Sequence, residues 1–208
     1  QLYTFEGLER KETQTVACGD LCAIVGISDI DISDTICDAE NPEGMPAIAI
    51  DEPTISMLFK INDSPFFGKE GKFVSSRHLR ERLFRECERD VALRVEETGD
   101  GFVVSGRGVL HLAILIETMR REGYELSVSR PRVVFKEENG QKMEPMEEVV
   151  IDVDDAYTGV VVEKMSVRKA EMIEMVPSGG GKTRRTFIAP SRGLIGYHSE
   201  FLTDTCGT

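Results

Sequence analysis

Apolar residues recur with helical and with strand spacing in alternation from residue 54 to residue 128, and this alternation predicts a β-α-β-β-α-β unit. The first helix is indicated by Leu79, Leu83 and Cys87, which lie four residues apart on one face. The expected elements are, in chain order, a strand at 54–61, a helix capped by Ser75 or Ser76 and running to 87, strands at 91–95 and 102–105, a helix at 109–121 and a strand at 124–128.

The same order begins again after a polar linker near residues 137–145, and it stops before its last strand. The expected elements are a strand at 148–153, a helical stretch at 157–169, hairpin strands at 172–176 and 182–188, and a helix at 191–202. The predicted fold class is therefore α+β, with two ferredoxin-like sandwiches of which the second lacks its final strand.

Residues 1–49 have a different pattern, in which short apolar runs alternate with turns. Strands are expected at 2–5, 13–17, 21–27 and 35–37, followed by a linker that contains Asn41-Pro-Glu-Gly44. So few strands cannot close a barrel by themselves.

The 208 residues are 40% hydrophobic and 30% charged, which is typical of a soluble globular protein. No apolar run approaches the roughly 20 residues of a membrane span. The chain opens Gln-Leu-Tyr-Thr without a basic and then apolar leader, so we expect no secretory signal and a chain that is processed or cut.

A net charge of −12 argues against a protein that coats nucleic acid, but the sign reverses locally between residues 164 and 192. This window is the basic-patch candidate, and its predicted RNA-contacting residues are Arg168, Lys169, Lys182, Arg184, Arg185 and Arg192. The alternative is a basic hairpin whose cations are balanced by neighbouring acids.

Metal and disulfide chemistry find little support. The five cysteines are odd in number and contain no C-x-x-C pair, which indicates reduced thiols, expected as small buried side chains. Asp152, Asp154 and Asp155 lack the glycine and the distal glutamate of a calcium loop. We therefore predict no metal site.

The segment Gly179-Gly-Gly-Lys182-Thr183 resembles the end of a phosphate-binding loop, but two requirements of that loop are missing. Val176 stands where the first glycine is needed, and a strand is expected after Lys182 instead of a helix. A flexible hairpin tip is the preferred interpretation.

Two other features have structural explanations. His111 is a single histidine on a helix, which is more often packed or solvated than catalytic. The arginines and glutamates of the first helix, including Glu81 and Arg85 four residues apart, predict an ion-paired face toward solvent. We therefore predict no catalytic residue.

Several longer sequence segments resemble those of a known protein family. The runs Val104-Ser-Gly-Arg-Gly-Val-Leu-His-Leu112, Met119-Arg-Arg-Glu-Gly123 and Ser129-Arg-Pro-Arg-Val133 resemble the third domain of translational GTPases such as elongation factor G. Gly19-Asp20 to Cys37-Asp38, Val91-Ala-Leu-Arg-Val-Glu-Glu97 and Pro190-Ser-Arg-Gly-Leu-Ile-Gly196 are similar to the BipA/TypA branch. The resemblance covers essentially the whole chain.

The resemblance implies three regions: 1–49 as the tail of the β-barrel second domain with a linker, 50–136 as the third domain, and 145–208 as an incomplete fifth domain. It implies strand order 4-1-3-2 in each split β-α-β sheet, which leaves the strand at 148–153 as an unpaired edge, covered by a neighbouring molecule or poorly ordered. Val109 and Ala170 depart from the usual acidic residue and glycine of the family.

By resemblance, the parent protein is a cytoplasmic GTPase that acts in stress adaptation and ribosome assembly. Its GTP-binding domain is expected upstream of this chain, so GTP and Mg²⁺ bind to the parent and no cofactor is expected here. The expected partner is the ribosome, through rRNA and ribosomal proteins, and not membrane or DNA. The chain itself is expected to be non-catalytic. Two alternatives stay open: a free-standing phosphate- or nucleotide-binding enzyme that uses Gly179 to Thr183, and a module that binds only protein.

Overall fold

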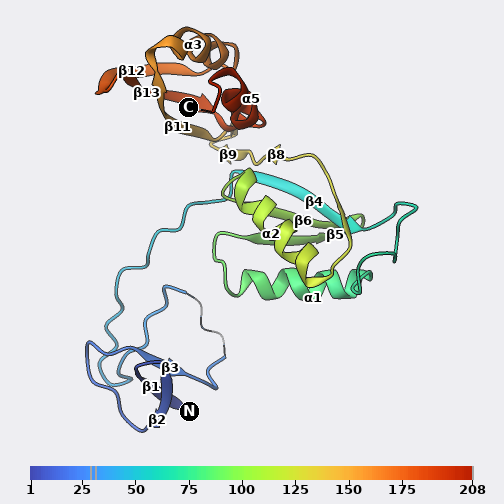
Figure 1. Ribbon diagram of the computed structural model, residues 1–208. Coiled ribbons are helices and arrows are strands. Elements are labelled where there is room, and N and C mark those ends of the chain that lie inside the picture. The colour runs from blue at the N-terminus through green and yellow to red at the C-terminus, as the bar shows by residue number, and fades with distance from the viewer. Residues whose placement is uncertain (29, 31, 208) are drawn as a thin grey trace. The chain divides into compact units, whose positions relative to one another are not determined.

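The computed structural model describes residues 1–28, 30 and 32–207 of the chain (Figure 1). The chain divides into two compact units, Gln1–Ala49 and Ile50–Thr208. Antiparallel sheets and a few helices make up an α+β protein, which confirms the predicted class.

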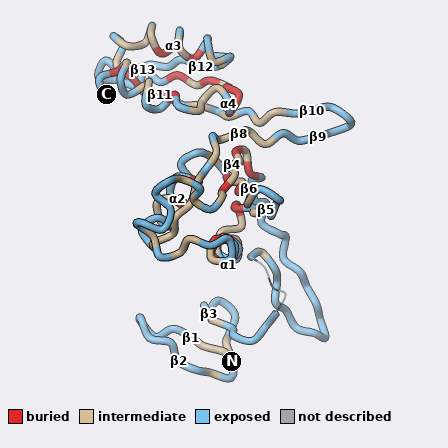
Figure 2. The backbone as a smooth tube through the Cα atoms, turned by 90° about the vertical axis from the view of Figure 1, so that its right-hand side faces the viewer, coloured by how far each residue is buried: buried red, intermediate tan, exposed pale blue. Residues whose placement is uncertain are grey.

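The first unit contains a three-stranded antiparallel sheet in the order β2-β1-β3. Its strands are β1 (Leu2–Glu6), β2 (Glu9–Thr13) and β3 (Cys22–Ile24). The predicted strand at 13–17 is wrong, because Gly7, at φ +64°, turns the chain directly from β1 into β2, so that the second strand uses residues 9–13. The predicted strand at 35–37 is also wrong, since these residues form no strand. None of the described residues of this unit is buried (Figure 2).

The second unit begins with a sheet in the order β5-β6-β4-β7, with β8 also paired to β4. This first sheet and its two helices consist of β4 (Ile55–Ile61), α1 (Ser76–Cys87), β5 (Arg94–Thr98), β6 (Gly101–Gly106), α2 (Val109–Glu122), β7 (Leu126–Val128) and β8 (Arg132–Val133). The β-α-β-β-α-β prediction is confirmed, and the observed order is the 4-1-3-2 arrangement that was expected.

Local signals in the sequence explain both helices. The Ser75 hydroxyl accepts a hydrogen bond from the His78 backbone N–H at 3.3 Å and caps α1. Gly123 ends α2 in the left-handed conformation, at φ +94°. The apolar faces of the two helices pack on one face of the first sheet, and this core consists of Ile55, Phe59, Leu79, Leu83, Leu93, Phe102, Val104, Leu112, Leu115 and Met119 (Figure 2).

The second sheet has the order β11-β13-β12. Its elements are β11 (Met146–Asp154), the 3-10 turn η1 (Asp155–Tyr157), α3 (Thr158–Val167), β12 (Glu171–Gly179), β13 (Lys182–Pro190), α4 (Ser191–Leu194) and α5 (Tyr197–Asp204). β11 pairs only with β13 among the strands of the described residues, so it lies at the edge of the sheet as expected. The helices cover a core around Val153, Val161, Met165 and Phe187.

Two sequence predictions in this region are wrong. The helix expected at 191–202 is two helices, because Gly196 at φ +80° interrupts the helical backbone between α4 and α5. The polar linker contains a hairpin of β9 (Lys136–Glu138) and β10 (Gln141–Met143), which turns at Asn139-Gly140 with both residues at positive φ. No helix of the described residues is long and apolar enough to cross a membrane.

Candidate nucleic-acid interface

The predicted RNA-contacting residues of 164–192 lie at two ends of the second sheet. Lys182 begins β13 opposite Gly179, while Lys169 lies two residues before β12 and Arg192 lies two residues after β13. A nine-residue strand separates these ends by about 30 Å at about 3.3 Å per residue. The window therefore supplies two separate small groups of cations.

Most of these cations are engaged in ion pairs. Arg184 donates a forked hydrogen bond to Asp152, with Nη2 2.7 Å from Oδ2, and it holds the pKa of Asp152 below its usual value. Lys182 lies 3.7 Å from Asp154. Asp152 and Asp154 stand directly opposite Arg184 and Lys182 on neighbouring strands, so both pairs are cross-strand pairs on one face of the sheet.

The other end of the sheet has the same character. Arg168 and Lys164 share the carboxylate of Glu200, and the Lys164 contact is 2.6 Å. Arg192 pairs with Glu144 at 2.7 Å. Each of these acids is distant in sequence from its cation, so composition alone does not show the pairing.

Arg185 and Lys169 differ from the rest. Arg185 is 2% exposed on the core side of β13, and its Nε and Nη1 atoms have no hydrogen-bond partner among the described residues. Lys169 is exposed at φ +66° and forms no ion pair with a described carboxylate. Lys169 is thus accessible to a phosphate, whereas the guanidinium of Arg185 is not.

Sequence reasoning missed a second group of cations, on the face of the first sheet that α1 and α2 leave uncovered. Ile55 and Phe59 point from β4 into the core, so Ser56, Leu58 and Lys60 point to the opposite face. Cross-strand register places further residues on this uncovered face, and they are Arg94, Glu96, Val103, Ser105, Ser127 and Arg132.

Lys60, Arg94 and Arg132 form no ion pair with any carboxylate in the described part of the chain. Glu96 is the acid among the register-placed residues of this face. The sequence did contain one signal of this face, the alternation of apolar and polar residues in β4. This alternation does not show which residues of the neighbouring strands lie beside Ser56 or Lys60, because that depends on the pairing register.

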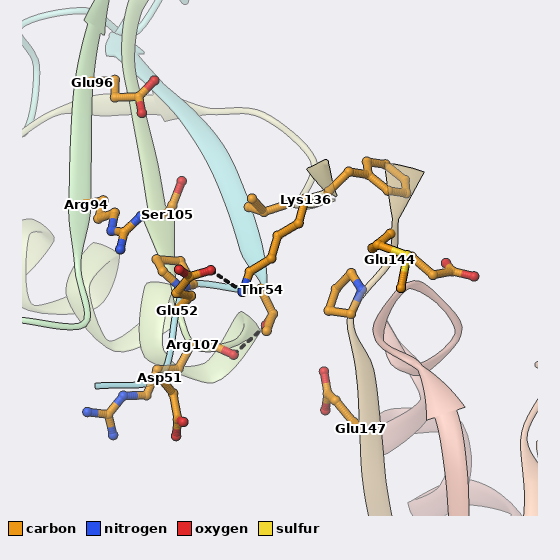
Figure 3. A pocket seen from close by; sticks show the side chains of 15 residues that line it. Asp51, Glu52, Thr54, Arg94, Glu96, Ser105, Arg107, Lys136, Glu144 and Glu147 are labelled. Carbon is orange, nitrogen blue, oxygen red and sulfur yellow. Dashed lines mark hydrogen bonds and ion pairs between the residues drawn. The ribbon is translucent and has the colours of Figure 1, made fainter. Parts of the chain in front are cut away.

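A cleft of about 690 Å³ lies beside this face (Figure 3). Arg94, Ser105 and Arg107 line it together with residues 51–54, 134–136 and 143–147, although not every residue of these segments reaches it. Glu52 pairs with Lys136 in the cleft, and this contact, followed by a smaller contribution from Arg94, lowers the pKa of Glu52. The Thr54 hydroxyl donates to the Arg107 carbonyl at 2.7 Å.

Other candidate chemistry has structural explanations. His111 Nε2 lies 2.6 Å from Asp90 Oδ2, while its Nδ1 accepts the Arg107 backbone N–H at 3.3 Å, so the ring links a helix to two loops. Residues 179–182 form the hairpin tip, and a strand follows Lys182 as predicted. No group of three or more metal-binding side chains occurs within residues 1–28, 30 and 32–207.

The thiols do not match their prediction. Cys18, Cys22, Cys37 and Cys206 are exposed, and Cys87 is partly buried beside the first core. The expectation of buried thiols is wrong because the first unit has no buried residue among those described and Cys206 follows the last helix.

The ion pairs predicted on α1 are partly different from those observed. Arg77 pairs with Glu81 at 2.9 Å, in place of the expected pair between Glu81 and Arg85. Arg82 is buried, with only 9% of its surface exposed, and it contacts Glu86 and Glu122. The solvent-facing assignment of Arg82 is therefore wrong, because Glu122 of α2 draws it into the space between the helices.

Comparisons with known proteins find similarity to one group of translation factors. Residues 141–208 match the family described as elongation factor G C-terminus. The "Large ribosomal subunit assembly factor BipA" of Escherichia coli (strain K12) is 54% identical over 204 residues, which cover 97% of this chain and 34% of that protein. The protein of the same name from Bacillus subtilis (strain 168) is 50% identical over 209 residues, covering 100% of this chain and 34% of its relative.

The chain thus spans about a third of the length of the curated relatives that it matches. A solved protein from Thermus thermophilus has a similar fold, with a TM-score of 0.54 at 13% identity over 99% of this chain and 47% of that one. The sequence motifs and the relatives that match nearly all of this chain indicate the same family.

Proposed function

Because this chain belongs to the BipA/TypA type of elongation factor G relatives, we propose that it is the ribosome-contacting region of a translational GTPase. The observation that carries the proposal is identity of 50–54% over nearly the whole chain to proteins named large ribosomal subunit assembly factor. Under this proposal the partner is the ribosome, including rRNA and ribosomal proteins, and the protein acts in the cytoplasm.

The three regions have separate roles in this proposal. Residues 1–49 are the tail of a β-barrel domain, residues 50–136 are a ferredoxin-like domain equivalent to the third domain of elongation factor G, and residues 145–208 are an incomplete equivalent of its fifth domain. The two ferredoxin-like regions present uncovered sheet faces with exposed cations, which suit contact with phosphate oxygens without reading bases.

Within 164–192, the residues that we propose for RNA contact are Arg168, Lys169, Lys182, Arg184 and Arg192. Lys169 is free of a described carboxylate, and the other four must exchange or share their acidic partners when RNA binds. Arg185 was predicted to contact RNA too, but its burial supports a structural role.

We propose that the chain does not hydrolyse GTP, and that GTP and Mg²⁺ bind elsewhere in the parent protein. Phosphoryl transfer needs a loop of backbone N–H groups around the phosphates and a hydroxyl and an aspartate for Mg²⁺. The glycine-rich tip at 179–181 leads into β13 and not into a helix, which also disfavours the phosphate-binding enzyme as an alternative.

Co-sedimentation with purified large ribosomal subunits tests the proposal. The chain is expected to pellet with the subunits, and the bound fraction should fall steeply as salt rises from about 50 to 200 mM because phosphate contacts release counterions. A chain that stays in the supernatant at low salt would contradict ribosome contact. Isothermal titration with GTP and Mg²⁺ should give no heat of binding, and a one-to-one micromolar site would favour the enzyme alternative.

A further inference from the structure

We propose that the uncovered face of the first sheet binds the phosphate backbone of RNA through four side chains in one row, which we call the Arg-Ser row: Arg94, Ser105, Ser56 and Arg132. This inference rests on the proposed function only in expecting the RNA to be ribosomal. It assigns contact to the region at 50–136, whereas the density of basic residues in the sequence favours 164–192.

The row follows from the register of four strands. Arg94 of β5 stands opposite Ser105 of β6, Ser105 stands opposite Ser56 of β4, and Ser56 stands opposite Arg132 of β8. Residues directly opposite each other in antiparallel strands point to the same face and lie about 5 Å apart. Two guanidinium groups therefore flank two hydroxyl groups over about 15 Å.

The two arginines of the row are not held in ion pairs by the described residues. Neither Arg94 nor Arg132 forms an ion pair with a carboxylate of the described residues, and both are exposed. Glu52, the acid whose pKa Arg94 influences, is already hydrogen-bonded to Lys136. A guanidinium without a carboxylate partner is free to donate two parallel N–H bonds to a phosphate.

The chemistry of the row fits a phosphodiester backbone better than a base or an acidic peptide. Arginine forks and serine hydroxyls are the side chains that contact phosphate and sugar oxygens. The uncovered face has no aromatic side chain among its register-placed residues on which a base could stack. Lys60 lies on the same face and can extend the contact along β4.

The cleft of Figure 3 limits the position of the RNA. Arg94, Ser105 and Arg107 lie along one wall together with Asp51, Glu52 and Glu96, while Glu144 and Glu147 lie across the cleft. Arg192 pairs with Glu144, whereas Glu147 has no ion pair with a described cation. Acids on both walls repel phosphate from the cleft, so the RNA backbone follows the Arg-Ser row and does not fill the cleft.

A direct test uses the 208-residue chain and a fluorescent 12-nucleotide single-stranded RNA. The double variant Arg94→Ala/Arg132→Ala should bind more weakly, and the slope of log K against log salt should fall in magnitude by about 1.4, or about 0.7 for each lost contact. The matched control is Arg85→Ala/Arg89→Ala, which removes two exposed cations without described ion pairs from the end of α1. The control should keep the slope of the unmodified chain.

Equal loss in both double variants would overturn the proposal, because it would indicate general electrostatic attraction. An unchanged slope in Arg94→Ala/Arg132→Ala would overturn it as well. Ser56→Ala/Ser105→Ala leaves the charge intact and should weaken RNA binding several-fold without changing the salt slope. If this variant binds RNA as tightly as the unmodified chain, the serine hydroxyls do not contact the RNA and the four-residue site is wrong. Circular dichroism melts confirm that each variant is folded.

Three further experiments distinguish an RNA-backbone site from a site for a free anion and from a protein-binding face. Competition by millimolar inorganic phosphate as strong as by RNA would indicate a site for a free anion and contradict a backbone site. RNA binding that is unaffected by the row, with loss of binding only to a ribosomal protein, would assign the face to protein and overturn the proposal. If free RNA binds through the row but ribosomal subunits do not bind, the proposed function fails and this inference stands.

Discussion

The uncovered faces of the two sheets both carry cations, but the residues opposite those cations differ. In the second sheet Arg184 faces Asp152 and Lys182 faces Asp154. In the first sheet Arg94 faces Ser105 and Arg132 faces Ser56. A carboxylate opposite an arginine makes a cross-strand ion pair, whereas a serine leaves the guanidinium free. The identity of the opposite residue thus separates cations that tie strands together from cations that can bind a partner.

The two sheets also differ in closure. β4 pairs with β6 on one side and with β7 and β8 on the other. β11 is the equivalent first strand of the second β-α-β-β-α region, and it pairs with β13 alone among the described strands. The complete sheet therefore pairs both backbone edges of its first strand, while the second sheet leaves one edge of β11 unpaired.

The largest expected effect concerns a cation that is paired and buried. Arg82→Ala should lower the free energy of unfolding by about 2–3 kcal/mol, because it leaves Glu86 and Glu122 without their partner between α1 and α2. The Nε atom of Arg82 lies 2.6 Å from Glu122, and Arg82 lowers the pKa of that carboxyl group. Urea unfolding measures the difference.

Arg80→Ala is the control for this variant, since Arg80 pairs with Glu97 on the surface with both side chains about half exposed. Loss of this pair should cost less than about 1 kcal/mol. Equal destabilisation by the two variants would contradict the distinction between buried and exposed pairs.

A charge swap should convert the first sheet into the pattern of the second. Ser56→Asp/Ser105→Asp places carboxylates opposite Arg132 and Arg94. RNA affinity should then fall about tenfold or more, equivalent to at least about 1.4 kcal/mol. Thermal stability should fall slightly, because positions 56 and 105 are also opposite each other and the two new carboxylates repel. Fluorescence anisotropy with the 12-nucleotide RNA measures the loss of affinity. Unchanged affinity would show that the residue opposite each arginine does not control RNA binding.

Acid should weaken the first ferredoxin-like region through Glu125. Its carboxylate accepts the backbone N–H groups of Gly68, Glu70 and Gly71, which lower its pKa to about 2 from an ordinary value of 4.5. Because the folded-state pKa is depressed, the stabilisation is present above pH 4.5 and is lost as the pH falls toward 2.

Melting curves between about pH 6 and pH 2 of the chain and of Glu125→Gln measure this contribution. The variant should melt at a lower temperature at the upper end of this range, and the difference should shrink as the pH approaches the lower end. If the difference in melting temperature between the two proteins does not change with pH, the carboxylate charge of Glu125 does not stabilise the loop at residues 68–71.

The smallest expected effect is local protection from hydrogen exchange. Amides of β4 should exchange more slowly than those of β11, since the unpaired edge of β11 exposes some of its N–H groups to water. Mass spectrometry of peptides that cover 55–61 and 146–154 measures the difference. Equal protection would indicate that another molecule or segment covers the edge of β11.

Much of the fold could be predicted from the sequence. The spacing of Leu79 and Leu83, the Ser75 cap and Gly123 predict both helices of the first region correctly, because these signals act within one or two turns. The β9–β10 hairpin was missed although Asn139-Gly140 is a strong turn signal, and the break at Gly196 was missed although glycine readily adopts positive φ.

The candidate interface could be predicted only in part. Counting basic residues located 164–192, but it could not show that Arg184 meets Asp152 or that Arg185 is buried, because both facts depend on the register of strands about thirty residues apart. The Arg-Ser row depends on four strands between residues 55 and 133, and no local pattern reveals it.

The central claim is that cations without carboxylate partners contribute more to the ribosome contact than cations held in ion pairs. It is tested most directly by co-sedimentation of large ribosomal subunits with three forms of the chain: unmodified, Arg94→Ala/Arg132→Ala, and Lys182→Ala/Arg184→Ala. Both variants lose two positive charges, and salt is varied from about 50 to 200 mM. The account predicts that the Arg94/Arg132 variant loses more of the salt dependence than the Lys182/Arg184 variant. A larger loss in the Lys182/Arg184 variant would contradict it and assign the contact to the second sheet.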